Sequence, residues 1–345
     1  MKKAVRVILF NLLLIALVLA LFEGAMYFLI RHPEVLKHCP KGIRNSMGYL
    51  YAHGERRTVQ FMPECARHDP GLGYTLKPGA CEHRATEFNT PYTINRLGLR
   101  DDEESLHQPA VIVVGDSYAM GWGVNQDESF AQILERKSGL KVLNAGVASY
   151  GTAREMLVLK RLDTSRLRYL IIQYCENDDD ENREFLLQGN RLRTMDRGTY
   201  ERHVREQNKP RDYYPGKYLG MKLLKAWKEF KVSRNKEKAT GTVAGDDVDF
   251  FLNALMKGPP DLSKVQIIVL EAVGKNDFDR NFVKRLESRI QRGAYPPPIR
   301  NMAFLDVTKV LTKEHYYVLD DHWTSAGHVA IAGALAEMIR NKGRK

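Results

Sequence analysis

The sequence contains few cysteines, and none of them has the spacing of a metal site. Its 345 residues include only four, at positions 39, 65, 81 and 175, and no pair is arranged as C-x-x-C. This spacing argues against structural zinc and thioredoxin-like redox chemistry. Spaced clusters of histidine, cysteine and acidic residues are also missing, so we predict no bound metal and no cofactor. Cys65 and Cys81 could form a disulfide if this part of the chain lies outside the cytosol.

A concentrated basic segment is missing as well, although the chain carries an excess of positive charge. The formal net charge is +11, but it does not fall in one block, and no basic motif with interleaved aromatic residues occurs. We therefore expect no nucleic-acid partner. Such an excess is typical of solvated surface, and it would also favour attraction to an anionic membrane or an acidic glycan.

One long apolar run is present, from Val7 to Ile30, and three basic residues precede it. About 20 apolar residues span a bilayer, so the run is long enough to cross one. The sequence Phe22-Glu23-Gly24-Ala25 fits an A-x-A cleavage pattern poorly, which favours an uncleaved anchor over a signal peptide. We expect a cytoplasmic tail and a transmembrane helix over residues 1–32, with the domain that follows outside the cytosol, on the periplasmic or outer face. Basic residues after the run weaken the positive-inside signal for this orientation.

Strand and helix patterns alternate from residue 111 onward, after a turn-rich segment over residues 33–108 in which Tyr92–Asn95 is one possible short strand. The expected strands of the alternating part are Val111–Val114, Lys141–Leu143, Tyr169–Tyr174, Val265–Leu270 and Ala303–Asp306. The expected helices include Ser129–Ser138, Thr152–Leu162, Phe282–Ile290 and His328–Ile339. The pattern predicts an α/β domain over residues 109–345, a flavodoxin-like three-layer α/β/α sandwich around a parallel five-stranded sheet.

A strongly basic insertion, at about residues 180–250, separates the third expected strand from the fourth. Within it, Tyr218–Phe230 has the apolar spacing of an amphipathic helix, and Ser233–Asp246 has the composition of a flexible polar linker. Insertions at the carboxyl ends of parallel strands often form lids or substrate walls. A solvated excursion on the surface explains the same pattern equally well.

The first expected strand runs directly into Gly115-Asp116-Ser117. A buried strand that ends in a tight turn can lift one hydroxyl out of the sheet, and glycine leaves room for such a turn. Ser117 is therefore a candidate nucleophile. Because Gly-Asp-Ser is also common turn chemistry, this stretch alone does not separate a catalytic serine from an ordinary turn.

Other polar groups follow the remaining strands. Gly146 comes after the second strand, Asn177 after the third, and Asp320 and His322 after the fifth. Ligands of open α/β sheets bind outside the carboxyl ends of the strands, so we expect these groups to meet near Ser117.

At these positions the chain resembles the SGNH/GDSL hydrolase family, which has serine in a GDS motif, then a glycine, then asparagine in G-x-N-D, and a late Asp and His. The resemblance covers residues 111–340 in order and spacing, and Tyr92–Arg100 resembles the lead-in of membrane-anchored members. It implies that Ser117 is the nucleophile and His322 the general base. Asp320 would orient the imidazole. The backbone N–H groups of Ser117 and Gly146 and the side-chain amide of Asn177 would form the oxyanion hole.

Two departures from the family pattern concern the acid and the asparagine. The usual D-x-x-H spacing would place the acid at Leu319, whereas Asp320 stands in D-x-H spacing. We prefer Asp320 to Asp321 because neighbouring residues of an extended stretch point to opposite faces. Cys175 replaces the glycine of G-x-N-D, so the family pattern does not predict the conformation of the local turn. His328 is expected to cap or open the final helix rather than act in catalysis.

The resemblance implies a membrane-anchored serine esterase of the SGNH/GDSL type. It would hydrolyse O-acyl or O-acetyl esters on a cell-envelope carbohydrate or lipid through an acyl-Ser117 intermediate. The alternative is an O-acyltransferase that moves the acyl group onto a cell-surface polysaccharide. The Asp-Asp-His-Trp stretch at 320–323 is similar to one in polysaccharide O-acetyltransferases of the alginate type, but there it precedes the serine motif. A third hypothesis is a glycan-binding protein without catalytic activity. It does not explain why the full set of Ser, Gly, Asn and His is present.

Overall fold

The chain folds into two compact units in the computed structural model, which describes residues 2–235, 245–258 and 260–342. The first unit comprises Met1–Arg56, Lys209–Val243 and Val318–Asp320, and the second comprises Arg57–Asn208, Ala244–Tyr317 and Asp321–Lys345. Most of the predicted polar linker lies at 236–244, outside the described residues. The domain boundaries expected from the sequence stay a prediction.

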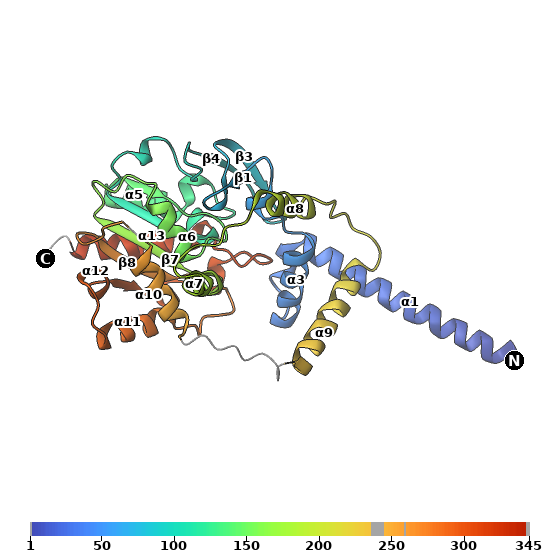
Figure 1. Cartoon of the computed structure of the whole chain (residues 1–345). Helices are drawn as coiled ribbons and strands as arrows, with labels where there is room; N and C mark the ends of the chain where they lie inside the picture. Colours follow the sequence, from blue (N-terminus) through green and yellow to red (C-terminus); the bar gives the residue numbers. More distant parts are fainter. Residues whose placement is uncertain (1, 236–244, 259, 343–345) are drawn as a thin grey trace. The chain divides into compact units, whose positions relative to one another are not determined.

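The second unit is built on a parallel five-stranded sheet (Figure 1). Its strands are β5 (Val111–Gly115), β6 (Val142–Asn144), β7 (Tyr169–Tyr174), β8 (Gln266–Glu271) and β9 (Ala303–Leu305). The strand order is β6-β5-β7-β8-β9, with parallel pairing throughout. This is the flavodoxin-like order, because the second strand lies outside the first. The predicted sheet is confirmed, and each strand differs from its expected range by at most one residue at either end.

Helices cover both faces of this sheet, so the predicted three-layer sandwich is confirmed. Along β5, Val111 and Val113 belong to one apolar cluster, whereas Ile112 and Val114 belong to another. The first cluster includes residues of α5 (Phe130–Ser138) and α13 (Ser325–Lys342). The second includes residues of α6 (Thr152–Leu159), α10 (Asp247–Lys257) and α11 (Phe282–Arg292). Side chains that alternate along each buried strand therefore fill two separate cores.

Shorter helices complete the second unit. They are α4 (Ser117–Met120), α7 (Asp178–Leu187), α8 (Arg197–Gln207) and α12 (Pro297–Arg300), with 3-10 turns at Val59–Phe61, Glu104–Leu106, Gln126–Glu128, Val307–Lys309 and Lys313–His315. Several expected helix ends were wrong, and the helices expected at Phe282–Ile290 and His328–Ile339 extend to Arg292 and Lys342. The helix that begins at Thr152 stops at Leu159, and the last helix begins at Ser325, so that His328 lies inside it rather than at its start.

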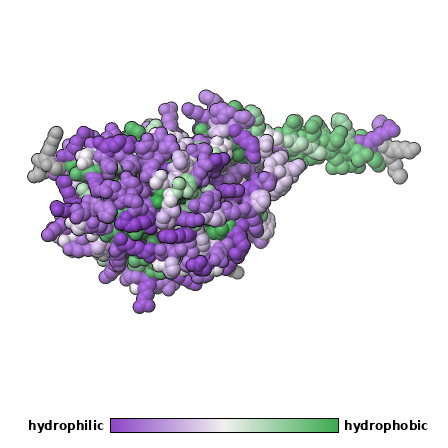
Figure 2. Space-filling model, turned by 90° about the horizontal axis from the view of Figure 1, so that it is seen from above, coloured by the Kyte–Doolittle hydropathy of each residue, from purple (hydrophilic) through white to green (hydrophobic). Residues whose placement is uncertain are grey.

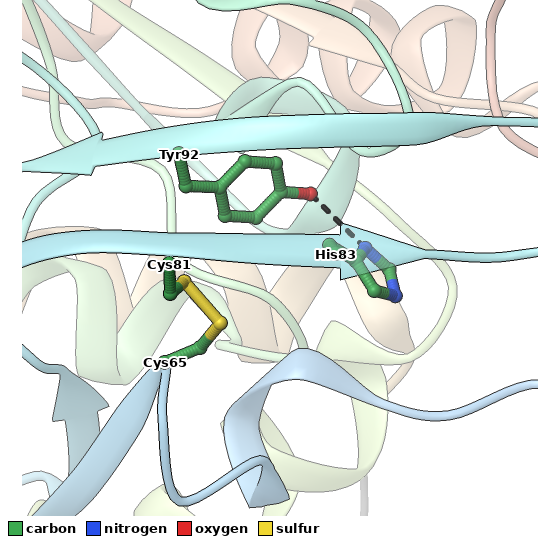
Figure 3. The surroundings of a disulfide bond; sticks show 4 residues. All are labelled: Cys65, Cys81, His83 and Tyr92. Carbon is green, nitrogen blue, oxygen red and sulfur yellow. Dashed lines mark hydrogen bonds between the residues drawn. A yellow bond between two sulfur atoms is a disulfide. The ribbon is translucent and has the colours of Figure 1, made fainter.

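Two antiparallel hairpins precede the sheet in the chain, where the sequence predicted one short strand. The first pairs β1 (Ala66–Asp69) with β2 (Gly73–Leu76), and the second pairs β3 (Gly79–Arg84) with β4 (Asn89–Ile94). A disulfide joins Cys65 to Cys81, with the two Cα atoms 5.4 Å apart, as shown in Figure 3. The predicted pairing of these cysteines is therefore confirmed, and the bridge ties the start of the first hairpin to the second.

The described residues of the first unit form four helices. They are α1 (Lys2–Arg31), α2 (Pro33–Leu36), α3 (Lys41–Gly54) and α9 (Lys217–Asn235). The helix α1 is long and apolar enough over Lys3–Arg31 to cross a membrane, and Figure 2 shows hydrophobic residues along most of its length. A signal sequence would share these properties. The side chains of Glu23, Met26 and Ile30, near its end, are buried in the folded chain.

Removing the disulfide should destabilise the second unit. A bridge that closes a loop of about 15 residues contributes roughly 3 kcal/mol to the free energy of unfolding, and here the two cysteines are 16 positions apart. Denaturant unfolding of a Cys65→Ala/Cys81→Ala variant should show this loss. The Cys39→Ala/Cys175→Ala variant removes the two free cysteines and is the matched control. Equal unfolding midpoints for the two variants would contradict a stabilising bridge.

Candidate active site

The turn after β5 is possible only because glycine occupies position 115. A Cβ atom there would lie 2.5 Å from Oε1 of Gln173 and 2.7 Å from Cβ of Ala119. Both distances are too short for any side chain. The strand therefore passes directly into Asp116 and Ser117 with its backbone pressed against the neighbouring strand β7.

Two side chains hold this turn in place. The Oε1 atom of Gln173 accepts hydrogen bonds from the N–H groups of Asp116 and Ala119, each at 3.0 Å. The carboxylate of Asp116 caps α4 by accepting the N–H of Tyr118 at 3.0 Å. Burial raises the pKa of Asp116, whereas the Tyr118 N–H and the nearby His322 favour its charged form.

The turn brings Ser117 against His322. The Oγ atom of Ser117 lies 2.7 Å from Nε2 of His322, a hydrogen bond between residues 205 positions apart. The sequence predicted this meeting from strand order alone. A serine hydroxyl in contact with an imidazole is the arrangement that lets histidine remove the hydroxyl proton.

Two aromatic rings pack against the imidazole of His322. The ring of Trp122 stacks on His322 with centroids 4.9 Å apart and an interplanar angle of 18°, and Tyr118 packs against it at 4.8 Å. The hydroxyl of Tyr118 donates to the carbonyl of Asp321 at 2.9 Å. The backbone of His322 accepts the N–H of Tyr317 at 3.1 Å. Only 8% of His322 is exposed, so its ring orientation is set by these contacts.

Arg100 fixes the loop that follows α4. Its guanidinium is fully buried and donates to the carbonyl groups of Met120, Gly121 and Val124. It also lies 3.9 Å from the ring centroid of Tyr92. Burial lowers its pKa, although the charge is still kept at neutral pH. One buried cation thus satisfies three carbonyl groups next to the serine turn.

Gly146 lies just after β6 and faces the same turn. A Cβ atom at this position would lie 2.5 Å from the backbone nitrogen of Met120 and 2.7 Å from Cβ of Ala119. Glycine is required there by the backbone of α4. The N–H of Gly146 donates to Oδ1 of Asn144 at 3.0 Å, so an oxyanion would have to share or replace that bond. Its oxyanion role stays a prediction.

Asn177 follows β7 and immediately precedes α7. Its side chain is exposed, whereas the next residue, Asp178, is buried and accepts the hydroxyl of Thr152 at 2.8 Å. The N–H of Asp178 donates to the carbonyl of Cys175 at 3.0 Å, so the turn closes with cysteine in place of glycine. The oxyanion role of Asn177 stays a prediction.

Asp320 and Asp321 differ in exposure, as the alternation of an extended stretch predicts. Asp320 is 1% exposed, and its Oδ1 atom lies 3.6 Å from Nη1 of Arg56 in the first unit. The side chain of Asp321 is 62% exposed and pairs with Lys275 at 3.5 Å. This difference favours Asp320 over Asp321 as the acid, and its role in orienting His322 stays a prediction.

The other two late histidines have structural contacts. His328 is buried, and its Nδ1 accepts the N–H of Phe130 at 3.1 Å, at the start of α5. His315 accepts the N–H of Thr312 at 2.9 Å. The structural reading of His328 is therefore supported. Trp323 packs against Phe130 in the core and is fully buried.

Sequence reasoning missed three supporting residues: Arg100, Trp122 and Gln173. Gln173 is a polar residue inside an otherwise apolar buried strand, which is a detectable signal. The positions of Arg100 and Trp122 depend on contacts with residues distant in the sequence, so no local pattern reveals their roles.

No protein-family model and no curated protein matches the chain. Solved structures do match. They are GDSL or SGNH hydrolases and esterases. A lipolytic protein of the G-D-S-L family from Desulfitobacterium hafniense shares 13% identity, covering 66% of this chain and 97% of that one, with a TM-score of 0.36. A two-domain esterase active on acetylated mannans shares 11% identity over 70% of this chain and 52% of its own length, with a TM-score of 0.39. An SGNH-hydrolase family esterase shares 14% identity, covering 68% of this chain and 96% of that one, with a TM-score of 0.28.

The stability of the protein should fall in acid because of His328. Burial lowers the pKa of this histidine to about 3, compared with about 6.5 in an unfolded chain. Between these values the unfolded chain binds a proton that the folded chain does not, so stability is lost as the pH falls below about 6.5. The free energy of unfolding, measured as a function of pH, should fall less steeply in acid in a His328→Gln variant than in the wild type. An identical slope in both proteins would contradict a buried neutral histidine.

Proposed function

We propose that the chain is a membrane-anchored serine esterase of the SGNH type. The observation that carries the proposal is the 2.7 Å contact between Ser117 Oγ and His322 Nε2 at the carboxyl end of β5. In a flavodoxin-like sheet this end of the first strand lies at the point where the strand order reverses, which is where such folds bind ligands.

The chemistry follows from this pair. The hydroxyl oxygen of Ser117 attacks the acyl carbon of an ester while its proton passes to Nε2 of His322. The histidine then gives that proton to the departing alcohol, which leaves an acyl-Ser117 ester. Water, deprotonated by the same imidazole, attacks the acyl carbon. The bond between that carbon and Oγ of Ser117 then breaks, the imidazole returns the proton to Oγ, and the carboxylic acid leaves. Donors at Gly146 and Asn177 would stabilise the negative oxygen that forms in each step.

The disulfide and the apolar helix α1 support a substrate in the cell envelope. The disulfide between Cys65 and Cys81 favours an oxidising compartment outside the cytosol. The apolar helix α1 would anchor the chain in the membrane. We therefore propose that the substrate is an O-acyl or O-acetyl ester of an envelope carbohydrate or lipid, and that α1 is an uncleaved single-pass anchor.

Replacement of the nucleophile or the base should abolish turnover. Ser117→Ala and His322→Ala should each lower kcat for p-nitrophenyl acetate by a factor on the order of 10⁴ or more, because the hydroxyl or its base is gone. Circular dichroism should show a retained fold. The control is His315→Ala, whose ring contacts Thr312 instead of Ser117.

Wild-type turnover in a folded Ser117→Ala protein would refute the proposal. Loss of activity in His315→Ala but not in His322→Ala would show that His315, and not His322, is the base. If the wild-type enzyme accumulates an acyl-Ser117 ester that is released only when a sugar acceptor is added, the chain is an acyltransferase.

Asn177→Ala should separate transition-state stabilisation from substrate binding. Its kcat should fall by roughly 10²–10³, the usual effect of removing one oxyanion donor. KM should change much less, because the amide acts on charge that develops in the transition state. The neighbouring Glu176→Ala is the matched control, since Glu176 is also exposed and pairs with Arg280. A changed KM with an unchanged kcat would make Asn177 a substrate contact.

A further inference from the structure

We infer that α9 is a second membrane contact of this chain, with its exposed apolar stripe lying in the headgroup region of the bilayer beside the end of α1. This inference rests on the anchor proposed above, because it requires that α1 crosses the membrane. It proposes that part of the basic insertion contacts a lipid surface. From the sequence, this insertion could have formed a lid, a substrate wall or a solvated excursion.

The exposure of α1 marks where the bilayer ends. The large apolar side chains between Val5 and Phe22 are exposed, whereas the buried residues of the helix begin at Glu23 and continue with Met26 and Ile30. The exposed part, Lys3–Phe22, contains about 20 residues, which at a rise of about 1.5 Å give the roughly 30 Å of a hydrocarbon core. Glu23 therefore lies at the membrane boundary, where the helix begins to pack against the rest of the first unit.

Glu23 also fixes where α9 begins. Its two carboxylate oxygens accept the N–H groups of Tyr218 at 3.0 Å and Leu219 at 2.9 Å, in the first turn of α9. A carboxylate at this position satisfies two unpaired amides and interacts favourably with the helix dipole. The rings of Tyr27 and Tyr213 pack against each other beside it, with centroids 4.5 Å apart. The start of α9 is thus held at the level of the bilayer boundary.

The direction of α9 suits a helix that lies on a membrane. Figure 1 shows α9 running across the direction of α1 rather than along it. A helix that starts at the boundary and crosses the axis of a transmembrane span stays near the surface of the bilayer instead of leaving it.

One side of α9 packs against α3 within the first unit. The ammonium group of Lys222 hydrogen-bonds the hydroxyl of Ser46, and that of Lys225 lies 4.1 Å from the ring centroid of Tyr49. Lys217 pairs with Glu55 at 2.7 Å near the start of the helix. These contacts set the rotation of α9 and determine which residues point away from α3.

The side turned away from α3 is apolar. Leu223, Trp227 and Phe230 are spaced four and three residues apart, which places them in one stripe, and they are 72%, 52% and 58% exposed. Two further lysines accompany the stripe: Lys228 is exposed, and the ammonium of Lys231 lies 3.8 Å from the ring centroid of Trp227. Lysines beside exposed leucine, tryptophan and phenylalanine are typical of helices that lie in the plane of a bilayer with anionic headgroups.

The emission of Trp227 can test this inference in the full-length chain. The other two tryptophans, Trp122 and Trp323, are buried in the second unit. The protein would be reconstituted in nanodiscs of phosphatidylcholine brominated on its acyl chains, with unbrominated lipid as reference. We expect quenching of the exposed tryptophan component, and we expect Trp227→Phe to lose that component while its p-nitrophenyl acetate hydrolysis stays unchanged.

Lipid charge provides the second measurement. Adding phosphatidylglycerol to the nanodiscs should increase the quenching of Trp227, since lysines near the surface attract anionic headgroups. This increase should be lost in a Lys228→Gln/Lys231→Gln variant. The same increase in the variant would contradict the role of these lysines.

Three results would overturn the inference. If iodide in the water quenches Trp227 and brominated lipid does not, the stripe faces solvent. If neither quenches it, a second copy or another protein covers the stripe. If alkaline carbonate removes the full-length chain from membranes, the anchor itself fails. A chain that resists carbonate but shows no lipid quenching refutes only the contact made by α9.

Discussion

A catalytic serine at the end of a buried strand depends on a turn that holds its hydroxyl against a base from a distant part of the chain. Here the turn follows β5 and the proposed base is His322, 205 positions after Ser117. The glycine at position 115 lets the backbone lie against Gln173, whose side chain accepts two of the turn's amide groups. If this turn relaxed by a fraction of an ångström, the hydroxyl would leave hydrogen-bonding distance of the imidazole.

The segment that precedes the sheet contributes to the same geometry. The hairpin of β3 and β4 carries His83, whose buried ring contacts Trp122 at 4.4 Å with an angle of 79° (Figure 3 shows His83 beside Tyr92). Trp122 in turn stacks on His322. Arg100, just after the second hairpin, holds the loop that carries Trp122. The early residues thus form part of the wall that orients the imidazole of His322.

The fold and the serine–histidine pair could be predicted from the sequence because both follow from local patterns. Buried parallel strands appear as continuous apolar runs, and their carboxyl ends identify one edge of the sheet. The roles of Arg100 and Glu23 could not be predicted this way. Glu23 interrupts an apolar run, and its function depends on amide groups of α9 about 195 positions later. The helix expected at His328–Ile339 was three residues too short at each end, because the apolar periodicity does not record the turns that begin and end it.

The central claim is that Ser117 is the nucleophile activated by His322. The most direct measurement is reaction of the full-length protein with a fluorophosphonate, followed by mass spectrometry of its peptides. The account predicts a single covalent adduct on Ser117, formed much more slowly in a His322→Ala variant, because the hydroxyl then keeps its proton. An adduct on another serine, or equal rates of labelling in both proteins, would contradict it.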